Sequence, residues 1–259
     1  MIKLGSGDKK KARPYIYIHY LVNSEGKSST PNELKVILLD IQTYLRGHGN
    51  ANDRQSQTLS EKIDGAIEAK DSLYRLGQRR YVESPSWHDN ISKFVKALGT
   101  RLEFEISNGH GDEPLDRPIT EVGYAQSLER LESHRKHRSS NYIMNLTEAV
   151  CKVRFPRKYK NEQYIIFNLM EPSDGMYGEI LCTRFAQGYI TNGGGFSHGA
   201  AGIHVHSSRI LGDEVWSEAR QEALKEETLQ KNVKEEVIRL KERKEKYDEL
   251  MSTAKYMVE

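Results

Sequence analysis

The chain has 259 residues, and its 39 lysine and arginine residues nearly balance its 37 aspartate and glutamate residues, leaving a formal net charge of +2. Hydrophobic residues make up 37% of the chain and charged residues 29%, so the chain can bury a core while part of its length is expected to stay exposed. No apolar run approaches the roughly 20 residues that a membrane-spanning helix needs, so we expect no transmembrane segment.

Residues 1–13 are basic and polar, and we expect them to form a flexible arm. The cations of this arm that we expect to contact a polyanion are Lys9, Lys10, Lys11 and Arg13. Residues 15–22 follow with the sequence Tyr-Ile-Tyr-Ile-His-Tyr-Leu-Val. Aromatic and β-branched residues at nearly every position predict a central strand with two apolar faces.

Three segments begin with a helix-capping residue and end on glycine. Thr30-Pro-Asn-Glu is a capping box with proline at the first helical position, and this helix is predicted to end at Gly47. A second helix is predicted from Thr58 to Gly77, and a third from Ser86 to Gly99. Apolar residues recur at helical spacing behind each cap, so all three helices should be amphipathic.

Alternating charged and apolar residues over 101–107 predict a strand with one wet face. A surface loop is expected at 108–120, and an amphipathic helix over 121–137. Further strands are predicted at 149–155, 163–170, 178–184, 188–191 and 202–207. Short strands with close turns favour an antiparallel sheet, so the expected fold class is α+β, with capped helices packed on a mostly antiparallel sheet in one domain over 14–210.

A long charged helix is predicted from Asp213 nearly to Glu259, within a C-terminal segment over 211–259 that serves packing or oligomerisation. Its apolar residues fall on alternating three- and four-residue steps, the spacing of a coiled-coil seam. The residues expected to contact a partner are Trp216, Val233, Val237, Leu240, Tyr247 and Met251. So narrow a seam buries too little area to stabilise the helix alone, so either the body of the domain or another helix must cover it.

Two further basic clusters could neutralise phosphate groups, with tyrosines nearby that could stack on bases. Their candidate contact residues are Arg135, Lys136, Arg138, Arg157, Lys158 and Lys160. Nucleic acid and an anionic membrane surface suit such clusters equally well. The alternative interpretation is that they are solvated charged turns.

Three histidines, His198, His204 and His206, lie within nine residues. If 202–207 is a strand, His204 and His206 project to the same face. Such imidazoles could bind a catalytic metal, or act as acid and base in cleaving a phosphodiester bond. The alternative is a pair of partly exposed strand histidines, and the glycine-rich loop over 192–202 lacks the features of a phosphate-binding loop because a strand is expected to follow it.

The hypothesis that the sequence favours is a non-enzymatic structural or assembly protein with a matrix- or coat-like layout and no cofactor or metal. It would contact nucleic acid or an anionic membrane through the arm, and bind itself or a protein partner through the C-terminal helix. A phosphodiester-cleaving enzyme, such as a toxin-like ribonuclease or a metal-assisted nuclease, is the first alternative, and a purely protein-binding adaptor is the second. The only two cysteines, Cys151 and Cys182, and a start without a secretory signal predict an intracellular protein, in the cytoplasm or the nucleus.

Overall fold

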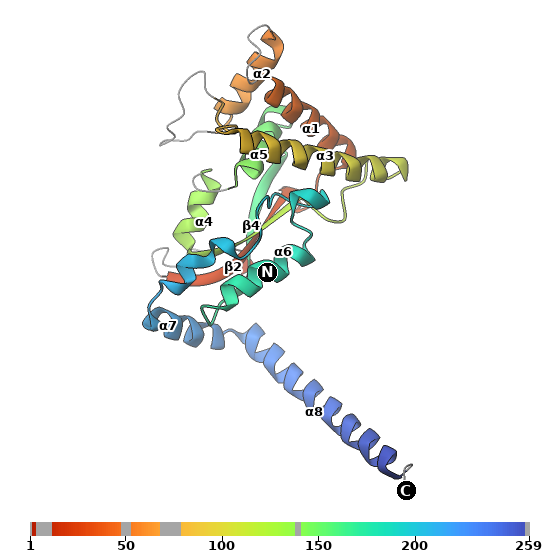
Figure 1. Cartoon of the computed structure of the whole chain (residues 1–259), viewed down its shortest axis with the longest axis vertical. Helices are drawn as coiled ribbons and strands as arrows, with labels where there is room; N and C mark the ends of the chain where they lie inside the picture. The colour runs from red at the N-terminus through yellow and green to blue at the C-terminus, as the bar shows by residue number, and fades with distance from the viewer. Residues whose placement is uncertain (1, 4–11, 48–52, 68–78, 138–140, 257–259) are drawn as a thin grey trace.

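The computed structural model describes residues 2–3, 12–47, 53–67, 79–137 and 141–256, and Figure 1 shows their arrangement. Within these ranges there are eight α-helices and an antiparallel sheet, and the last of the helices is long and charged. The predicted fold class, α+β with capped helices packed on a mostly antiparallel sheet, is confirmed. Helices also occupy several segments for which the sequence predicted strands.

β2 (Ala12–Asn23) is the central strand of the sheet, between β3 (Thr120–Ser127) and β4 (Tyr159–Asn168). Both neighbours run antiparallel to it. Residues 15–18 are all buried, so both faces of the strand are covered. The central strand predicted over 15–22 is therefore confirmed.

β1 (Ile2–Lys3) is a two-residue strand at the outer edge of β4. The segment over 1–13, expected to be a flexible arm, thus contains a short strand, whose antiparallel pairing a β-branched side chain favours. At its other end, Arg13 already belongs to β2. Lys9, Lys10 and Lys11 lie outside the described residues.

Four helices form a layer at one end of the sheet (Figure 1). They are α1 (Pro31–Arg46), α2 (Arg54–Gly65), α3 (Pro85–Ser107) and α5 (Tyr142–Arg154). α1 opens with the predicted capping box, in which the Thr30 hydroxyl accepts from the Glu33 amide and the Glu33 carboxylate accepts from the Thr30 amide. The caps of α2 and α3 are Asp53 and Ser84, a few residues before the predicted ones.

The buried apolar residues form three clusters, one in the helical layer and one on each face of the sheet. Leu21 of β2 and Tyr159 of β4 pack into the core of the helical layer. One face of the sheet packs against α4 (Leu128–Arg135). The other face packs against α6 (Asp174–Phe185), the 3-10 helix η2 (Ile203–Arg209) and α7 (Asp213–Leu224). A second 3-10 helix, η1 (Ile190–Asn192), lies against α3.

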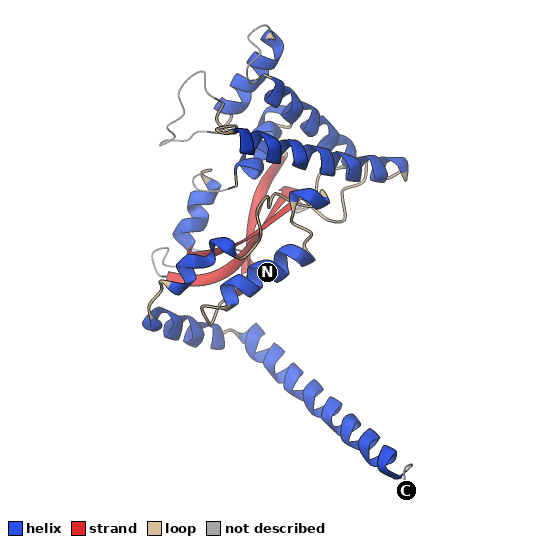
Figure 2. Ribbon diagram, in the orientation of Figure 1, coloured by secondary structure: helices blue, strands red, loops and turns tan. Residues whose placement is uncertain are grey.

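α8 (Glu227–Tyr256) leaves the body and extends away from it, as Figures 1 and 2 show. The prediction of one helix from Asp213 to the end is wrong at Lys225 and Glu226, where α7 stops. The physical reason lies in the side chains at the break. The Asn168 amide of β4 donates to the Glu226 carboxylate, and the Gln230 amide donates to the Leu224 carbonyl at 3.0 Å, which satisfies an orphan carbonyl at the end of α7.

Residues 101–107 continue α3, so the strand predicted there is wrong. Leu102 is 1% exposed and extends the buried stripe of Ile91, Phe94 and Leu98 by one helical turn. Phe104 is 67% exposed, so the alternation of apolar residues does not mark a buried strand face. Glycine at position 99 does not end the helix because burial on both sides of it outweighs its low helix propensity.

The helix predicted over 121–137 is wrong in its first half, which is β3. Gly123 lies opposite Tyr17 of β2, and a Cβ there would be only 2.3 Å from the Tyr17 hydroxyl. The Tyr17 side chain therefore lies across β3, a close approach that only glycine permits. The helical spacing of Val122, Ala125 and Leu128 is coincidental, because Val122 and Ala125 fall in separate core clusters on the two faces of the sheet.

Most strands predicted in the second half are helices. The predicted strand at 149–155 lies in α5, whose start is set by Asn141: its side-chain oxygen accepts from the amides of the second and third residues that follow. The predicted strand at 178–184 lies in α6, the second half of 188–191 lies in η1, and most of 202–207 lies in η2. Only the strand at 163–170 is confirmed, as part of β4.

Candidate functional site

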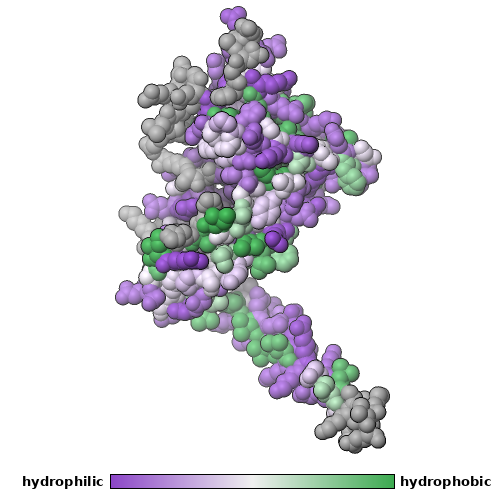
Figure 3. Space-filling model, in the orientation of Figure 1, coloured by the Kyte–Doolittle hydropathy of each residue, from purple (hydrophilic) through white to green (hydrophobic). Residues whose placement is uncertain are grey.

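The most unusual surface of the molecule is the exposed length of α8. Every residue from Gln230 to Ser252 is exposed. Among them are five large apolar residues that fall on the coiled-coil spacing, and we call this set the α8 stripe. Its members are Val233 (51% exposed), Val237 (46%), Leu240 (54%), Tyr247 (62%) and Met251 (54%). Figure 3 shows hydrophobic side chains along this helix, away from the body.

Local interactions along α8 are too weak to stabilise so long a helix without a partner surface. Lys231 pairs with Glu235 at 3.9 Å, and Arg239 pairs with Glu236 at 3.5 Å. Such exposed pairs contribute little, because solvent screens them and two long side chains lose freedom. Since most helical stability in proteins comes from packing an amphipathic face, the α8 stripe needs a partner surface.

α7, in contrast to α8, buries its apolar face. Trp216 is 2% exposed and packs in the core cluster that covers one face of the sheet, together with Ile16 and Ile18 of β2. Ala219 and Ala223 of the same helix are also buried. Trp216, which the sequence placed among the residues that contact a partner, is therefore a residue of the body's own core.

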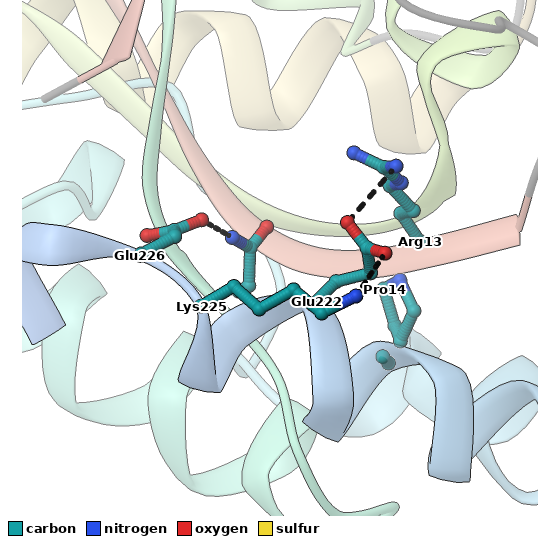
Figure 4. A pocket seen from close by; sticks show the side chains of 7 residues that line it. Arg13, Pro14, Glu222, Lys225 and Glu226 are labelled. Carbon is teal, nitrogen blue, oxygen red and sulfur yellow. Dashed lines mark hydrogen bonds and ion pairs between the residues drawn. The ribbon is translucent and has the colours of Figure 1, made fainter. Parts of the chain in front are cut away.

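A pocket of about 260 Å³ lies at the root of α8, where β2, β4 and α7 meet (Figure 4). Arg13 reaches Glu222 of α7 at 3.5 Å, and Lys225 reaches the same carboxylate at 3.4 Å. Asn168 donates to Glu226 beside them. These contacts hold the start of β2 against the α7–α8 break, so Arg13 lies at the root of α8 and is already paired with an acidic residue.

The predicted basic turn is largely neutralised by neighbouring acids. Lys158 lies 2.5 Å from Glu33, and Lys160 lies 2.6 Å from Glu162. Burial alone would raise the pKa of Glu33, but hydrogen bonds from Lys158 and from the Tyr159 hydroxyl outweigh it and lower that pKa. Arg157 is exposed and has a left-handed φ of 65°. Two of the three cations predicted here therefore serve local pairing.

The other predicted polyanion contacts lie around the end of α4. Lys136 is exposed at the C-cap of that helix. The backbone of Arg135 belongs to α4, but its side chain, like the whole of Arg138, lies outside the described residues.

The structure contradicts the strand geometry on which the histidine hypothesis is based. His198 is exposed, with its ring 4.9 Å from that of Tyr142. His204 and His206 belong to η2, so the expectation that a strand projects them to one face is wrong. Their side chains lie outside the described residues. Among the side chains that the structure does describe, no group of three histidine, cysteine or acidic residues has the geometry of a metal site.

A buried polar cluster between the sheet and α4 was not predicted. His19 of β2 is fully buried, and its Nδ1 lies 3.4 Å from Glu121 of β3. The Gln163 amide nitrogen lies 2.6 Å from His19 Nε2 and donates to the Leu131 carbonyl at 3.2 Å. Since an amide nitrogen only donates, His19 Nε2 is the acceptor and Nδ1 carries the proton, facing Glu121. The pairing of strands far apart in sequence creates this cluster, so no local pattern could have revealed it.

His134 of α4 completes this cluster. Its ring centroid lies 5.8 Å from that of His19, and neither of its nitrogens has a hydrogen-bond partner within the described part of the chain. Burial lowers its pKa to about 4, against the opposing influence of Glu121. Nearby, burial raises the pKa of Glu179 to about 7, although the Gly202 amide donates to it. The cluster thus holds a neutral imidazole inside the body, away from the pocket at the root of α8.

Comparisons with protein-family models, curated proteins and solved structures find no match to this chain. None of the helices within the described residues combines the length and the apolar character needed to cross a membrane. Among the described residues, those of the α8 stripe form an apolar surface that extends away from the body of the protein.

Proposed function

We propose that this protein is a structural assembly protein. In this proposal α8 binds a second helix, and the basic residues that precede β2 contact a polyanion, either nucleic acid or an anionic membrane surface. The observation that carries the proposal is the exposure of the whole α8 stripe, in a chain that buries the equivalent face of α7. A narrow apolar seam flanked by charges is the surface that coiled-coil partners recognise.

The position of Arg13 supports the link between the two activities. It lies at the root of α8 through its contact with Glu222, and Lys9, Lys10 and Lys11 precede it closely in the chain. Pairing of two chains near this root would give one particle two basic segments. Two linked weak contacts raise the overall affinity for a polyanion without any new contact.

Both cysteines are free thiols, Cys151 buried in α5 and Cys182 half-buried in α6. This supports an intracellular location for the protein, where thiols stay reduced.

The assembly half of the proposal is tested by Leu240→Asp in the full chain, with mass measured by light scattering over a range of concentrations. A charge in the seam should shift the mass toward that of a single chain. Ile238→Asp is the matched control, because Ile238 is similarly exposed, at 56%, but lies outside the seam. If both variants keep the mass of the wild type, α8 is not the assembly surface.

The polyanion half is tested by replacing Lys9, Lys10 and Lys11 with glutamine, which leaves β1 and β2 intact. Binding to RNA and to vesicles with anionic lipid should weaken, and its dependence on salt should become flatter by about one unit of logarithmic slope per lost phosphate contact. The control replaces the exposed Lys35, Lys93 and Lys96 of α1 and α3, which removes the same charge elsewhere. Equal losses in the two variants would show that only net charge matters.

A further inference from the structure

We propose that the occupant of the α8 stripe is a second copy of this chain, and that the two α8 helices form a parallel, in-register, two-stranded coiled coil. This inference rests on the proposed function and deepens it by naming the partner and its orientation. The charged residues that flank the stripe support this orientation.

The stripe fixes the position of every residue in the seven-residue repeat. Val237, Lys244 and Met251 occupy the first core position, a, while Leu240 and Tyr247 occupy the second, d. The flanking positions are then also fixed. Glu236 and Arg243 are at position g, and Lys234, Lys241 and Asp248 are at position e.

Parallel pairing brings opposite charges together. In a parallel two-stranded coil, a residue at g faces the residue at e five positions further along the other helix. Glu236 then faces Lys241 of the second copy, and Arg243 faces Asp248. The two-fold axis repeats each contact, so all four flanking pairs in this part of the coil are attractive.

Antiparallel pairing brings like charges together along one flank. If Val237 lies opposite Leu240 of the second copy, residues at e face residues at e, and residues at g face residues at g. Lys234 then faces Lys241 and Glu227 faces Asp248, which are repulsive contacts, while Glu236 faces Arg243, which is attractive, and the symmetry repeats each contact. Charge complementarity therefore selects the parallel arrangement.

Lys244 points to the number of helices in the coil. It occupies a core position in the middle of the stripe and is exposed, as is every residue from Gln230 to Ser252. A single polar residue at position a fixes the register and the oligomeric state at some cost in stability. In a two-stranded coil, the long lysine side chain can reach solvent past the seam.

The same residue argues against a membrane as the occupant. Helices that lie on a membrane present a broad apolar face, whereas the α8 stripe is one residue wide and Lys244 interrupts it. A protein helix with the same repeat fits this surface better.

The orientation is tested by disulfide cross-linking of the full chain, in a Cys182→Ala background that removes the half-buried thiol. Tyr247→Cys should link to itself at least tenfold faster than Glu249→Cys, which places the thiol on the outer face of the helix. In the antiparallel arrangement, residue 247 instead lies opposite residue 230 of the second copy. A mixture of Tyr247→Cys and Gln230→Cys chains would then form the mixed dimer, which would overturn the inference while leaving assembly through α8 intact.

Light scattering on the same samples distinguishes a failure of the inferred orientation from a failure of self-association itself. A two-chain mass with the Tyr247→Cys link supports the inference, and any larger mass contradicts the two-stranded coil. A one-chain mass at high concentration overturns both self-association and its orientation. In that case, sedimentation with anionic vesicles that Leu240→Asp abolishes would identify a membrane as the occupant.

A charge exchange gives a test that does not depend on cysteine. Glu236→Lys should weaken the association by roughly three- to tenfold, because two attractive contacts become repulsive. Adding Lys241→Glu to that variant should restore the wild-type association, since the pair is merely reversed. In an antiparallel coil Lys241→Glu alone would strengthen association by removing the contact with Lys234, and that result would contradict the inference.

Discussion

α7 and α8 follow each other in the chain and carry the same kind of amphipathic repeat, yet the apolar face of α7 is buried and that of α8 is exposed. α7 buries Trp216 against the sheet, whereas α8 leaves Val237 and Leu240 about half exposed. The break at Lys225 and Glu226 separates the two: Ala223 before it is buried, whereas every residue from Gln230 to Ser252 is exposed. An apolar repeat therefore identifies a face that must be covered, but the neighbouring residues decide what covers it.

The largest expected effect is on the stability of the body, which a substitution in α7 should lower and a substitution in α8 should not. Trp216→Ala should lower the free energy of unfolding of the body by about 3–5 kcal/mol, because it removes a buried indole and leaves a cavity. Val237→Ala should leave the unfolding of the body unchanged, since that side chain touches no part of it. Urea denaturation followed by circular dichroism at low protein concentration measures both. An equal loss in the two variants would show that α8 packs on its own body.

A pH-dependent loss of stability should be confined to the body. His134 has a pKa of about 4 in the folded chain and about 6.5 when unfolded. Stability from this residue is therefore complete above pH 6.5 and falls as the pH drops toward 4, by roughly 3 kcal/mol, because the unfolded chain takes up the proton first.

Comparing the wild type with His134→Phe at pH 7.5 and pH 4 isolates this contribution. The comparison is needed because Glu179 acts in the opposite sense: its raised pKa makes the folded chain lose stability as the pH rises toward 7. The phenylalanine variant should lose less stability on acidification than the wild type. An identical loss in both would show that His134 is accessible to protons in the folded chain.

The close packing of β2 against β3 predicts a smaller loss of stability for a substitution at Gly123. In Gly123→Ala the new methyl group would meet the Tyr17 ring, and relaxing that overlap should cost about 1–3 kcal/mol of stability. Gly65→Ala is the control, because no atom lies within 4 Å of a Cβ at that position. Thermal unfolding of both variants measures the difference. A stable Gly123→Ala protein would mean that the side chain of Tyr17 does not lie across β3.

The smallest effect concerns the core of the coil. Lys244→Leu should strengthen association by roughly tenfold, because a buried apolar contact replaces a charged one in the seam. It should also weaken the preference for two chains, so that a larger assembly becomes populated at high concentration. Sedimentation equilibrium measures both quantities. Unchanged association would place Lys244 outside the contact.

The sequence predicts the helices with clear ends far better than it predicts the second half. The capping box of Thr30 and Glu33 is a local signal, and the structure contains it as predicted. By contrast, the predicted strand over 149–155 overlooks the cap at Asn141, whose side chain starts α5. Short apolar runs have no clear period, so a buried helix and a strand cannot be told apart without knowing where they begin.

The candidate sites also divide into features that the local sequence shows and features that depend on residues far apart in the chain. The spacing of the α8 stripe is visible in the sequence, but the burial of Trp216 depends on where α7 meets the sheet. The cluster of His19, Glu121 and His134 depends on pairings between distant strands and α4, which composition and spacing do not encode. The neutralisation of Lys158 by Glu33 is equally non-local, since 125 residues separate them.

Hydrogen exchange over residues 233–251, at low and at high protein concentration, tests the central claim most directly. We predict that the amides of α8 exchange fast at low concentration and become protected as the concentration rises, while those around Trp216 in α7 are protected at both. Protection of α8 that does not change with concentration would mean that its own chain covers the stripe. Absence of protection at every concentration would mean that no second copy binds it, and either result would contradict the account.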